Sequence, residues 1–239
     1  YKVDTSAPTV SSIAISGATG ALNSTLNAGD VVSTTVTLSE AVTVTGTPQL
    51  ALNIGGTTVQ ANYASGSGTN AITFTYTIVA GQADTNGISL AANSLSLNAG
   101  TIVDLAGNTA TLTTALVADN TAYKVDTSAP TATITLSDTA LAVGETATVT
   151  IVFSEAVTSF TNADLTVQNG TLSNVTSSDN ITWTGTFTPT ATLEDTSNVI
   201  SLATSYTDLA GNTGTVASSA NYAIDTAAPT VSSIAISGA

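Results

Sequence analysis

The side chains that could do chemistry in this sequence are carboxylates in three short motifs, which occur twice in the same order. They are the aspartate of Val-Asp-Thr-Ser-Ala-Pro, the glutamate of Ser-Glu-Ala-Val-Thr and the aspartate of Asp-Leu-Ala-Gly-Asn-Thr. The first motif returns a third time as Ile-Asp-Thr-Ala-Ala-Pro. These carboxylates are Asp4, Glu40 and Asp104, then Asp126, Glu155 and Asp208, and finally Asp225. Their recurrence in matching contexts makes them the candidate metal ligands of the chain.

The residue types of these motifs indicate a hard cation. The sequence contains no His and no Cys, so only oxygen ligands are on offer. Three carboxylates that meet repel one another unless they are protonated or share a cation. A flexible mixture of carboxylates, carbonyls and water favours Ca²⁺ over Mg²⁺. We therefore expect Ca²⁺ as the cofactor.

A purely structural interpretation of the same motifs stays open. The aspartate of Asp-Leu-Ala-Gly-Asn can form an Asx-turn with the following backbone, with the glycine supplying a positive φ. Asp126 can likewise cap a turn before the proline that follows it. Glu155 is harder to explain as a turn former, because glutamate is not one of the usual turn residues.

Alternating side chains predict β-strands along most of the chain and no helix. From Ala71 to Ile78 and from Ile181 to Thr188, apolar residues alternate with threonines, which is typical of a half-buried strand. Trp183 falls on the apolar face of the second run, so we interpret it as a core residue rather than a sugar platform. The expected strands lie near 10–16, 31–38, 49–54, 57–63, 71–79, 88–97 and 115–125, and then near 131–137, 146–153, 165–167, 171–176, 181–188, 199–206 and 220–224.

Seven strands in each unit of roughly 100 residues predict an all-β chain of tandem immunoglobulin-like Greek-key β-sandwiches. Short extended linkers would join them end to end, because proline fixes φ and keeps its neighbour extended. We assign 1–7 to a linker and the end of a preceding repeat, 8–126 to domain 1, 127–225 to domain 2, and 226–239 to the first strand of a following repeat. Asp225–Ala239 repeats Asp4–Ala18 with one change, Ala227 for Ser6. The sequence therefore looks like a window of a longer tandem array.

This topology would gather the three motifs at one pole of each domain. If the first strand leaves that pole and the second returns to it, the loop after the second strand lies beside the incoming linker. The loop before the last strand ends at the same pole. Asp126 would then be a shared ligand at the junction between the domains. A second set of acidic residues, which comprises Asp30, Asp84 and the pair Glu194-Asp195, is interpreted as solvated loop charge.

Charge and composition exclude several classes of function. The net charge is −14, and the only cations are Lys2 and Lys124, so no surface can displace counterions from nucleic acid. An anionic bilayer is disfavoured for the same reason, and no apolar run approaches the roughly 20 residues of a membrane span. Without His, Cys or Arg no nucleophile and base triad can form, and adjacent Glu194 and Asp195 do not face each other across a substrate. We expect no enzyme.

The combination of the Val-Asp-Thr-x-Ala-Pro linker, the Ser-Glu-Ala-Val corner and the Asp-Leu-Ala-Gly-Asn turn resembles the bacterial Ig-like tandem repeats of giant secreted adhesins and biofilm-associated surface proteins. The resemblance covers essentially the whole chain. It implies export to the extracellular space or the bacterial cell surface, often by type I secretion. It also implies Ca²⁺ sites near domain junctions.

Two functions follow from these observations. In the first, the chain is a non-catalytic structural repeat that forms a calcium-stiffened stalk or filament supporting adhesion or a biofilm matrix. Its partners would be neighbouring repeats of the same chain, and Ca²⁺ would neutralise like charges and permit lateral self-association. In the alternative, one Ig-like module recognises a host receptor or glycan through its loops. The near-identical repetition at Asp225–Ala239 favours the first.

Overall fold

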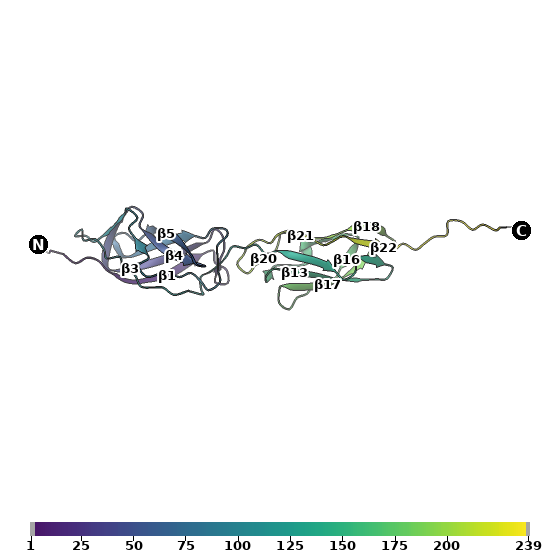
Figure 1. The fold of residues 1–239 in the computed structure, drawn as a ribbon, viewed down its shortest axis with the longest axis horizontal. Coiled ribbons are helices and arrows are strands. Elements are labelled where there is room, and N and C mark those ends of the chain that lie inside the picture. Colours follow the sequence, from purple (N-terminus) through teal and green to yellow (C-terminus); the bar gives the residue numbers. More distant parts are fainter. Residues whose placement is uncertain (1–2, 238–239) are drawn as a thin grey trace. The chain divides into compact units, whose positions relative to one another are not determined.

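The computed structural model describes residues 3–237, which divide between Ser128 and Ala129 into two compact units. Tyr1 and Lys2 of the first linker lie outside the described residues, as do the last two residues of the C-terminal repeat. Apart from one turn of 3-10 helix, every regular element in 3–237 is a strand (Figure 1), which confirms the all-β prediction. Within this part of the chain, no helix has the length and apolar character that a membrane span requires.

The first unit is a β-sandwich with ten strands. They are β1 (Val10–Thr19), β2 (Thr25–Leu26), β3 (Val31–Thr45), β4 (Gln49–Ile54), β5 (Thr57–Ser65), β6 (Thr69–Thr77), β7 (Ala83–Asp84), β8 (Leu95–Ser96), β9 (Thr101–Val103) and β10 (Lys124–Asp126). One sheet has the order β1-β3-β6-β5-β4-β8, with β9 beside β3, and the other has the order β2-β10-β7. Val36 and Phe74 of the large sheet and Leu26 and Val125 of the small one share one buried core. The two sheets are therefore the two layers of a sandwich.

Strand β3 shows how the sequence pattern builds this core. Every second residue from 32 to 38 points inward, and the apolar ones, Val32, Val36 and Leu38, are at most 1% exposed. Thr34 occupies an inward position of the same strand, also fully buried. Strand β3 is antiparallel to both β1 and β6, so it lies between two neighbours along most of its length.

The second unit contains twelve strands, most of them shorter than those of the first. They are β11 (Ala132–Leu136), β12 (Ala140–Ala142), β13 (Ala147–Phe153), β14 (Val157–Thr158), β15 (Leu165–Val167), β16 (Gly170–Leu172), β17 (Thr182–Pro189), β18 (Glu194–Asn198), β19 (Ile200–Leu202), β20 (Thr207–Asp208), β21 (Ala217–Ser218) and β22 (Tyr222–Asp225), with the 3-10 turn at Asn162–Asp164. The sheets have the orders β11-β13-β17-β16, β12-β22-β18, β15-β19-β21 and β14-β20.

An aromatic cluster fills one part of the core of the second unit. Phe153 and Phe160 have ring centroids 5.0 Å apart, and Tyr206 lies 4.9 Å from Phe153. Trp183 meets Phe160 edge to face at 5.1 Å and packs, half-buried, against the core. Such edge-to-face contacts between rings stabilise a core beyond the area they bury. Trp183 is therefore part of the packing, as its place in the alternating run predicts.

Some predicted strands are shorter than expected, and several short ones were not predicted. The run 88–97 forms only β8 and isolated bridges, one of which joins Leu90 to Val117. The interpretation of Glu194 and Asp195 as loop charge was wrong, because both lie in β18, where they pair with β22. Asp84 was also misinterpreted, since it is 3% exposed and accepts hydrogen bonds from the amides of Gly55 and Gly87, both at 2.8 Å.

Candidate metal centre

Asp104 lies in a tight turn that its own carboxylate organises. Its Oδ1 accepts from the amides of Ala106 and Asn108, both at 2.8 Å, and its Oδ2 accepts from Asn108 Nδ2 at 2.7 Å. Gly107 has a φ of +93°, which explains why glycine stands there. The Asx-turn interpretation of this motif therefore describes its local structure correctly. These three hydrogen bonds fix the orientation of the carboxylate, and only 4% of the residue is exposed.

Asp4 reaches the same turn from the linker before β1. Its Oδ1 accepts from the amide of Ser6 at 3.0 Å, which is a second Asx-turn. Its backbone carbonyl accepts from Asn108 Nδ2 at 3.3 Å. Asn108 therefore contacts both Asp104 and the linker, so one amide side chain joins two of the three motifs.

Glu40 comes from the middle of β3, not from a loop. We expected a loop after the second strand, but β3 runs continuously from Val31 to Thr45 and its pairing with β6 shifts register between Thr37 and Val42. The irregular stretch carries Glu40, which is partly exposed. The adjacent Ser39 is fixed by two bonds, from its amide to Thr9 O at 2.8 Å and from Thr9 N to its Oγ at 3.1 Å.

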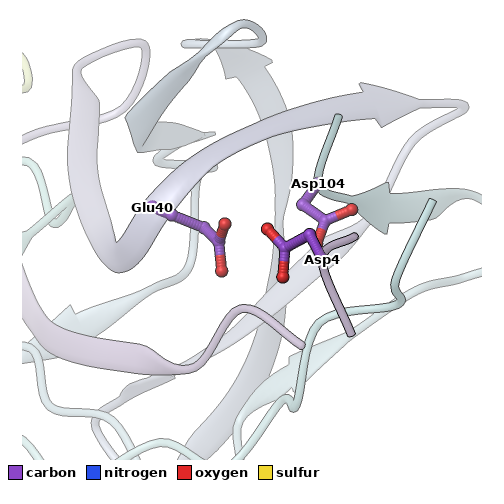
Figure 2. Close-up of side chains that lie close together, drawn as sticks. All are labelled: Asp4, Glu40 and Asp104. Atoms are coloured by element: carbon purple, nitrogen blue, oxygen red, sulfur yellow. The ribbon is translucent and has the colours of Figure 1, made fainter. Parts of the chain in front are cut away.

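The three carboxylates of the first unit converge. One carboxylate oxygen from each of Asp4, Glu40 and Asp104 lies within 4.8 Å of the others. Figure 2 shows the Glu40 carboxylate facing that of Asp4, with Asp104 beside Asp4. The structure thus brings together three residues that the sequence separates by up to 100 positions, and their role as metal ligands stays a prediction.

The three carboxylates place negative charges close together, and this affects their pKa values. Desolvation raises the pKa of Glu40, and the charges of Asp4 and Asp104 raise it further. For Asp104, desolvation alone would raise the pKa, but the hydrogen bonds from Asn108 and the turn amides outweigh it and lower the pKa. The hydrogen bonds of the turn therefore favour the ionised form of Asp104, whereas desolvation and the two neighbouring charges disfavour the ionised form of Glu40.

The donor set fits a calcium ion. Two oxygens bound to one Ca²⁺ at 2.3–2.6 Å can lie no more than about 5.2 Å apart. The three carboxylate oxygens meet that condition, and they come from a rigid turn, an irregular strand and a linker. Carboxylate oxygens also suit a hard cation better than a metal ion that prefers thiolate or imidazole ligands.

The second unit repeats the turn of the first almost bond for bond. Asp208 Oδ1 accepts from the amides of Ala210 at 2.8 Å and Asn212 at 2.9 Å, and Asp208 Oδ2 accepts from Asn212 Nδ2 at 2.8 Å. Carboxylate oxygens of Glu155 and Asp208 lie within 4.8 Å of each other. The two motifs of the second unit therefore meet as their counterparts do in the first.

The remaining predicted ligands are Asp126 and Asp225, each of which is the last residue of a strand. Asp126 closes β10 in the first unit, where its Oδ1 accepts from Ser128 N at 2.9 Å in the same Asx-turn that Asp4 forms with Ser6. Asp225 closes β22, exposed and opposite Glu194. The shared junction role of Asp126 stays a prediction, as does the role of Asp225.

Two polar residues that hold the motifs in place were not predicted from the sequence. The first is the serine of Ser-Glu-Ala-Val, which bonds to the threonine after the linker proline in both units, Ser39 to Thr9 and Ser154 to Thr131. The second is the asparagine at the end of the turn motif. Both residues recur in the two copies of their motifs, and this recurrence indicated that they matter. Their hydrogen-bond partners could not be predicted, because these lie far away in the sequence.

Part of the chain is similar to a known family of bacterial domains. Residues 126–224 match the bacterial Ig-like domain family. No curated protein matches the sequence. Among solved structures the chain is similar to FdeC, an Escherichia coli adhesin, at 12% identity and a TM-score of 0.37, over 90% of this chain and 63% of that one. It is also similar to the I9–I11 tandem of titin, at 10% identity and a TM-score of 0.36, over 84% of this chain and 60% of that one.

Proposed function

We propose that this chain is a non-catalytic structural segment of a large extracellular bacterial surface protein. Its Ig-like domains would form a stalk or filament, stiffened by Ca²⁺, that supports adhesion or a biofilm matrix. The observation that carries the proposal is the convergence of Asp4, Glu40 and Asp104 in the first unit. The match of residues 126–224 to a bacterial Ig-like domain supports the structural role, because Ig-like families are typically structural or binding modules.

Calcium would act on the linker more than on the core. Asp4 belongs to the exposed segment before β1, whereas Asp104 is buried in a turn of the sandwich. An ion held by both would fix the linker to the pole of the domain and relieve the repulsion that Glu40 experiences. The cores themselves are complete without a metal, since each unit has its own cluster of buried apolar residues. We therefore expect chelation to free the linker while both sandwiches stay folded.

Calorimetric titration of the whole chain with CaCl₂ tests this proposal. The wild type should bind with Kd roughly 10⁻⁴–10⁻³ M, as extracellular modules do. Glu40→Gln should weaken the binding of one ion about tenfold or more, because it removes a formal charge from the ligand set. Glu145→Gln is the matched control, since Glu145 accepts a hydrogen bond from the Ala142 amide in a different loop. Equal affinities in wild type and Glu40→Gln would disprove the site.

Hydrogen exchange separates a stiffening site from an ion that merely binds. With Ca²⁺, the amides of residues 3–9 should exchange more slowly, and those of β3 and β6 should exchange at the same rate as without it. A calcium-induced change confined to the core strands would contradict the stalk mechanism even if the ion binds.

A further inference from the structure

The threonine that follows the linker aspartate binds a loop of the unit before the linker. In the first unit this residue is Thr127, which comes directly after the last residue of β10. Its Oγ1 donates to Gln82 O at 2.8 Å and accepts from Gly81 N at 2.9 Å. One hydroxyl group therefore satisfies both a donor and an acceptor in the loop between β6 and β7.

The second unit forms the same kind of contact with a loop of different sequence. Thr226 comes directly after β22, and its Oγ1 donates to Thr190 O at 2.7 Å and accepts from Leu193 N at 3.0 Å. Its own amide donates to Leu193 O at 2.7 Å, and the residue is only 5% exposed. The loop reads Ala-Gly-Gln in the first unit and Thr-Ala-Thr-Leu in the second. The recurring element is therefore the threonine hydroxyl, not the sequence of the loop that receives it.

The loop of the first unit is organised by its own side chains. Val79 N donates to Gln82 Oε1 at 2.9 Å, and Gln82 Nε2 donates to Tyr76 OH at 2.9 Å. Gly81 has a φ of +87°, which glycine adopts readily. These bonds orient the Gly81 amide and the Gln82 carbonyl toward the hydroxyl of Thr127. None of the bonds named here involves a carboxylate.

The other end of the linker is bonded to the unit that follows it. Pro130 is buried, and its carbonyl oxygen accepts from Thr215 N at 3.1 Å and from Thr215 Oγ1 at 3.3 Å. Only Ser128 and Ala129 lie between Thr127 and Pro130. The boundary between the two compact units falls between these two residues. Each half of the linker therefore belongs, by its hydrogen bonds, to a different unit.

We propose that Thr127 and Thr226 are latches, each of which holds the start of a linker on the preceding unit without a metal ion. The latch at Thr127 leaves only Ser128 and Ala129 between the two bonded ends of the linker. A calcium ion would then have a short segment to order, which lowers the conformational entropy that its binding must overcome. This consequence rests on the proposed function. The latch itself does not, because its bonds involve no metal ligand.

Hydrogen exchange of the whole chain in EDTA tests the latch. Thr127→Val keeps the shape of the side chain but removes the hydroxyl, so the Gly81 amide should exchange about tenfold faster, while the amides of β3 keep their rates. Thr127→Ser retains the hydroxyl and should stay within about twofold of wild type. Thr226→Val is the reciprocal control, since it should accelerate exchange at Leu193 and leave Gly81 unchanged. Equal exchange of Gly81 in wild type and Thr127→Val, or equal acceleration in Thr127→Val and Thr127→Ser, would overturn the proposal.

Addition of CaCl₂ distinguishes the latch from the calcium site. In the wild type the Gly81 amide should exchange at the same rate, within about twofold, in CaCl₂ and in EDTA. Protection of Gly81 in CaCl₂ alone would contradict a latch that needs no metal. If calcium does not bind the chain, the proposed function fails, but the difference between wild type and Thr127→Val in EDTA should remain.

Trypsin measures whether the latch keeps the end of the first unit closed. Trypsin cleaves after Lys and Arg, and the sequence contains only Lys2 and Lys124. Lys124 lies in β10, so cleavage there requires this strand to leave its sheet. In EDTA, Thr127→Val should be cut after Lys124 about tenfold faster than wild type, because cleavage follows the population of the open form. Thr101→Val, which removes an exposed hydroxyl bonded to Thr45 Oγ1 at 2.7 Å, should be cut at the wild-type rate. Equal cleavage of Thr127→Val and wild type would show that the hydroxyl does not hold the linker.

Discussion

Gly214 lies directly beneath the ring of Tyr206. A methyl group on Gly214 would lie 2.2 Å from two ring carbons, so no side chain fits there. The Gly214 amide donates to the Tyr206 carbonyl at 2.9 Å, and in the first unit the Ala110 amide donates to the Ile102 carbonyl at the same distance. The two units thus share this backbone hydrogen bond but differ in the side chains beside it. The second unit pairs the large ring of Tyr206 with Gly214, and the first unit pairs the smaller Ile102 with Ala110.

Gly214→Ala should destabilise the second unit by about 1–3 kcal/mol, because the added methyl overpacks the site. Thermal unfolding followed by near-ultraviolet circular dichroism measures this change. Gly17→Ala is the control, since no heavy atom lies within 4 Å of the added carbon. Tyr206→Ile should relieve the clash, so the double variant should lose less stability than the sum of the single losses. Strict additivity would show that the pair does not act as a unit.

Thr34→Val should leave the stability of the first unit unchanged or raise it by about 1 kcal/mol. Thr34 Oγ1 is buried and has no hydrogen-bond partner among the described residues, so its removal takes away an uncompensated polar group. Thr114→Val provides the contrast, because the buried Thr114 Oγ1 accepts from Ser94 N at 3.0 Å. That variant should lose about 1–3 kcal/mol. Urea unfolding of both decides the matter, and a clear loss in Thr34→Val would count against this account.

Asp179 should stabilise the second unit at neutral pH and cease to do so in acid. The amides of Thr182 and Ile181 and the hydroxyl of Ser177 donate to its carboxylate and lower its pKa. A lowered folded pKa gives stability that is present above the unfolded value of about 3.9 and is lost as pH falls through the folded value. Asp179→Asn should therefore reduce the loss of stability of the second unit at acid pH. The urea midpoint of unfolding, measured over a series of pH values, shows this change. If the urea midpoints of wild type and Asp179→Asn fell equally with falling pH, the stabilising role of the Asp179 carboxylate would be refuted.

Glu40 should have the opposite effect in the absence of Ca²⁺. Its pKa is raised by desolvation and by Asp4 and Asp104, so the folded state holds its proton more tightly than the unfolded state does. Stability should then fall as pH rises from the ordinary value near 4.5 through the raised folded value. Glu40→Gln should abolish this decline, and millimolar Ca²⁺ should reverse it in the wild type. Urea midpoints between pH 4 and 7, with EDTA or CaCl₂, supply the measurement.

Long alternating runs and local turn chemistry could be predicted from the sequence, whereas short strands held by distant partners could not. Gln49–Ile54 forms β4 with the expected bounds because its alternation specifies which face is buried. Strand β18 was missed because Glu-Asp-Thr-Ser-Asn has no apolar alternation, and pairing with β22 alone makes it a strand. Topology correctly placed the first three carboxylates at one pole. It did not reveal that Glu40 lies in a continuous strand, because the register shift depends on how β3 meets β6.

Asp4→Asn separates the turn role of this motif from its role as a ligand. Asparagine keeps the oxygen that accepts from Ser6 N, so the Asx-turn and the stability of the first unit should stay within about 0.5 kcal/mol of wild type. The loss of a formal charge should nevertheless weaken one calcium-binding event about tenfold. Asp138→Asn is the matched control, because Asp138 accepts from Ala140 N in a similar turn outside the motifs.

The same substitution at Asp126 extends the test to the second motif set. Asp126 accepts from Ser128 N as Asp4 accepts from Ser6 N, so Asp126→Asn should also preserve its turn. If the two sets bind alike, Asp126→Asn should weaken a different calcium ion from the one that Asp4→Asn weakens. The combined variant should then bind both ions about tenfold more weakly than wild type, which calorimetric titration measures. A wild-type stoichiometry and affinity in Asp126→Asn would leave the turn as the only role of that aspartate.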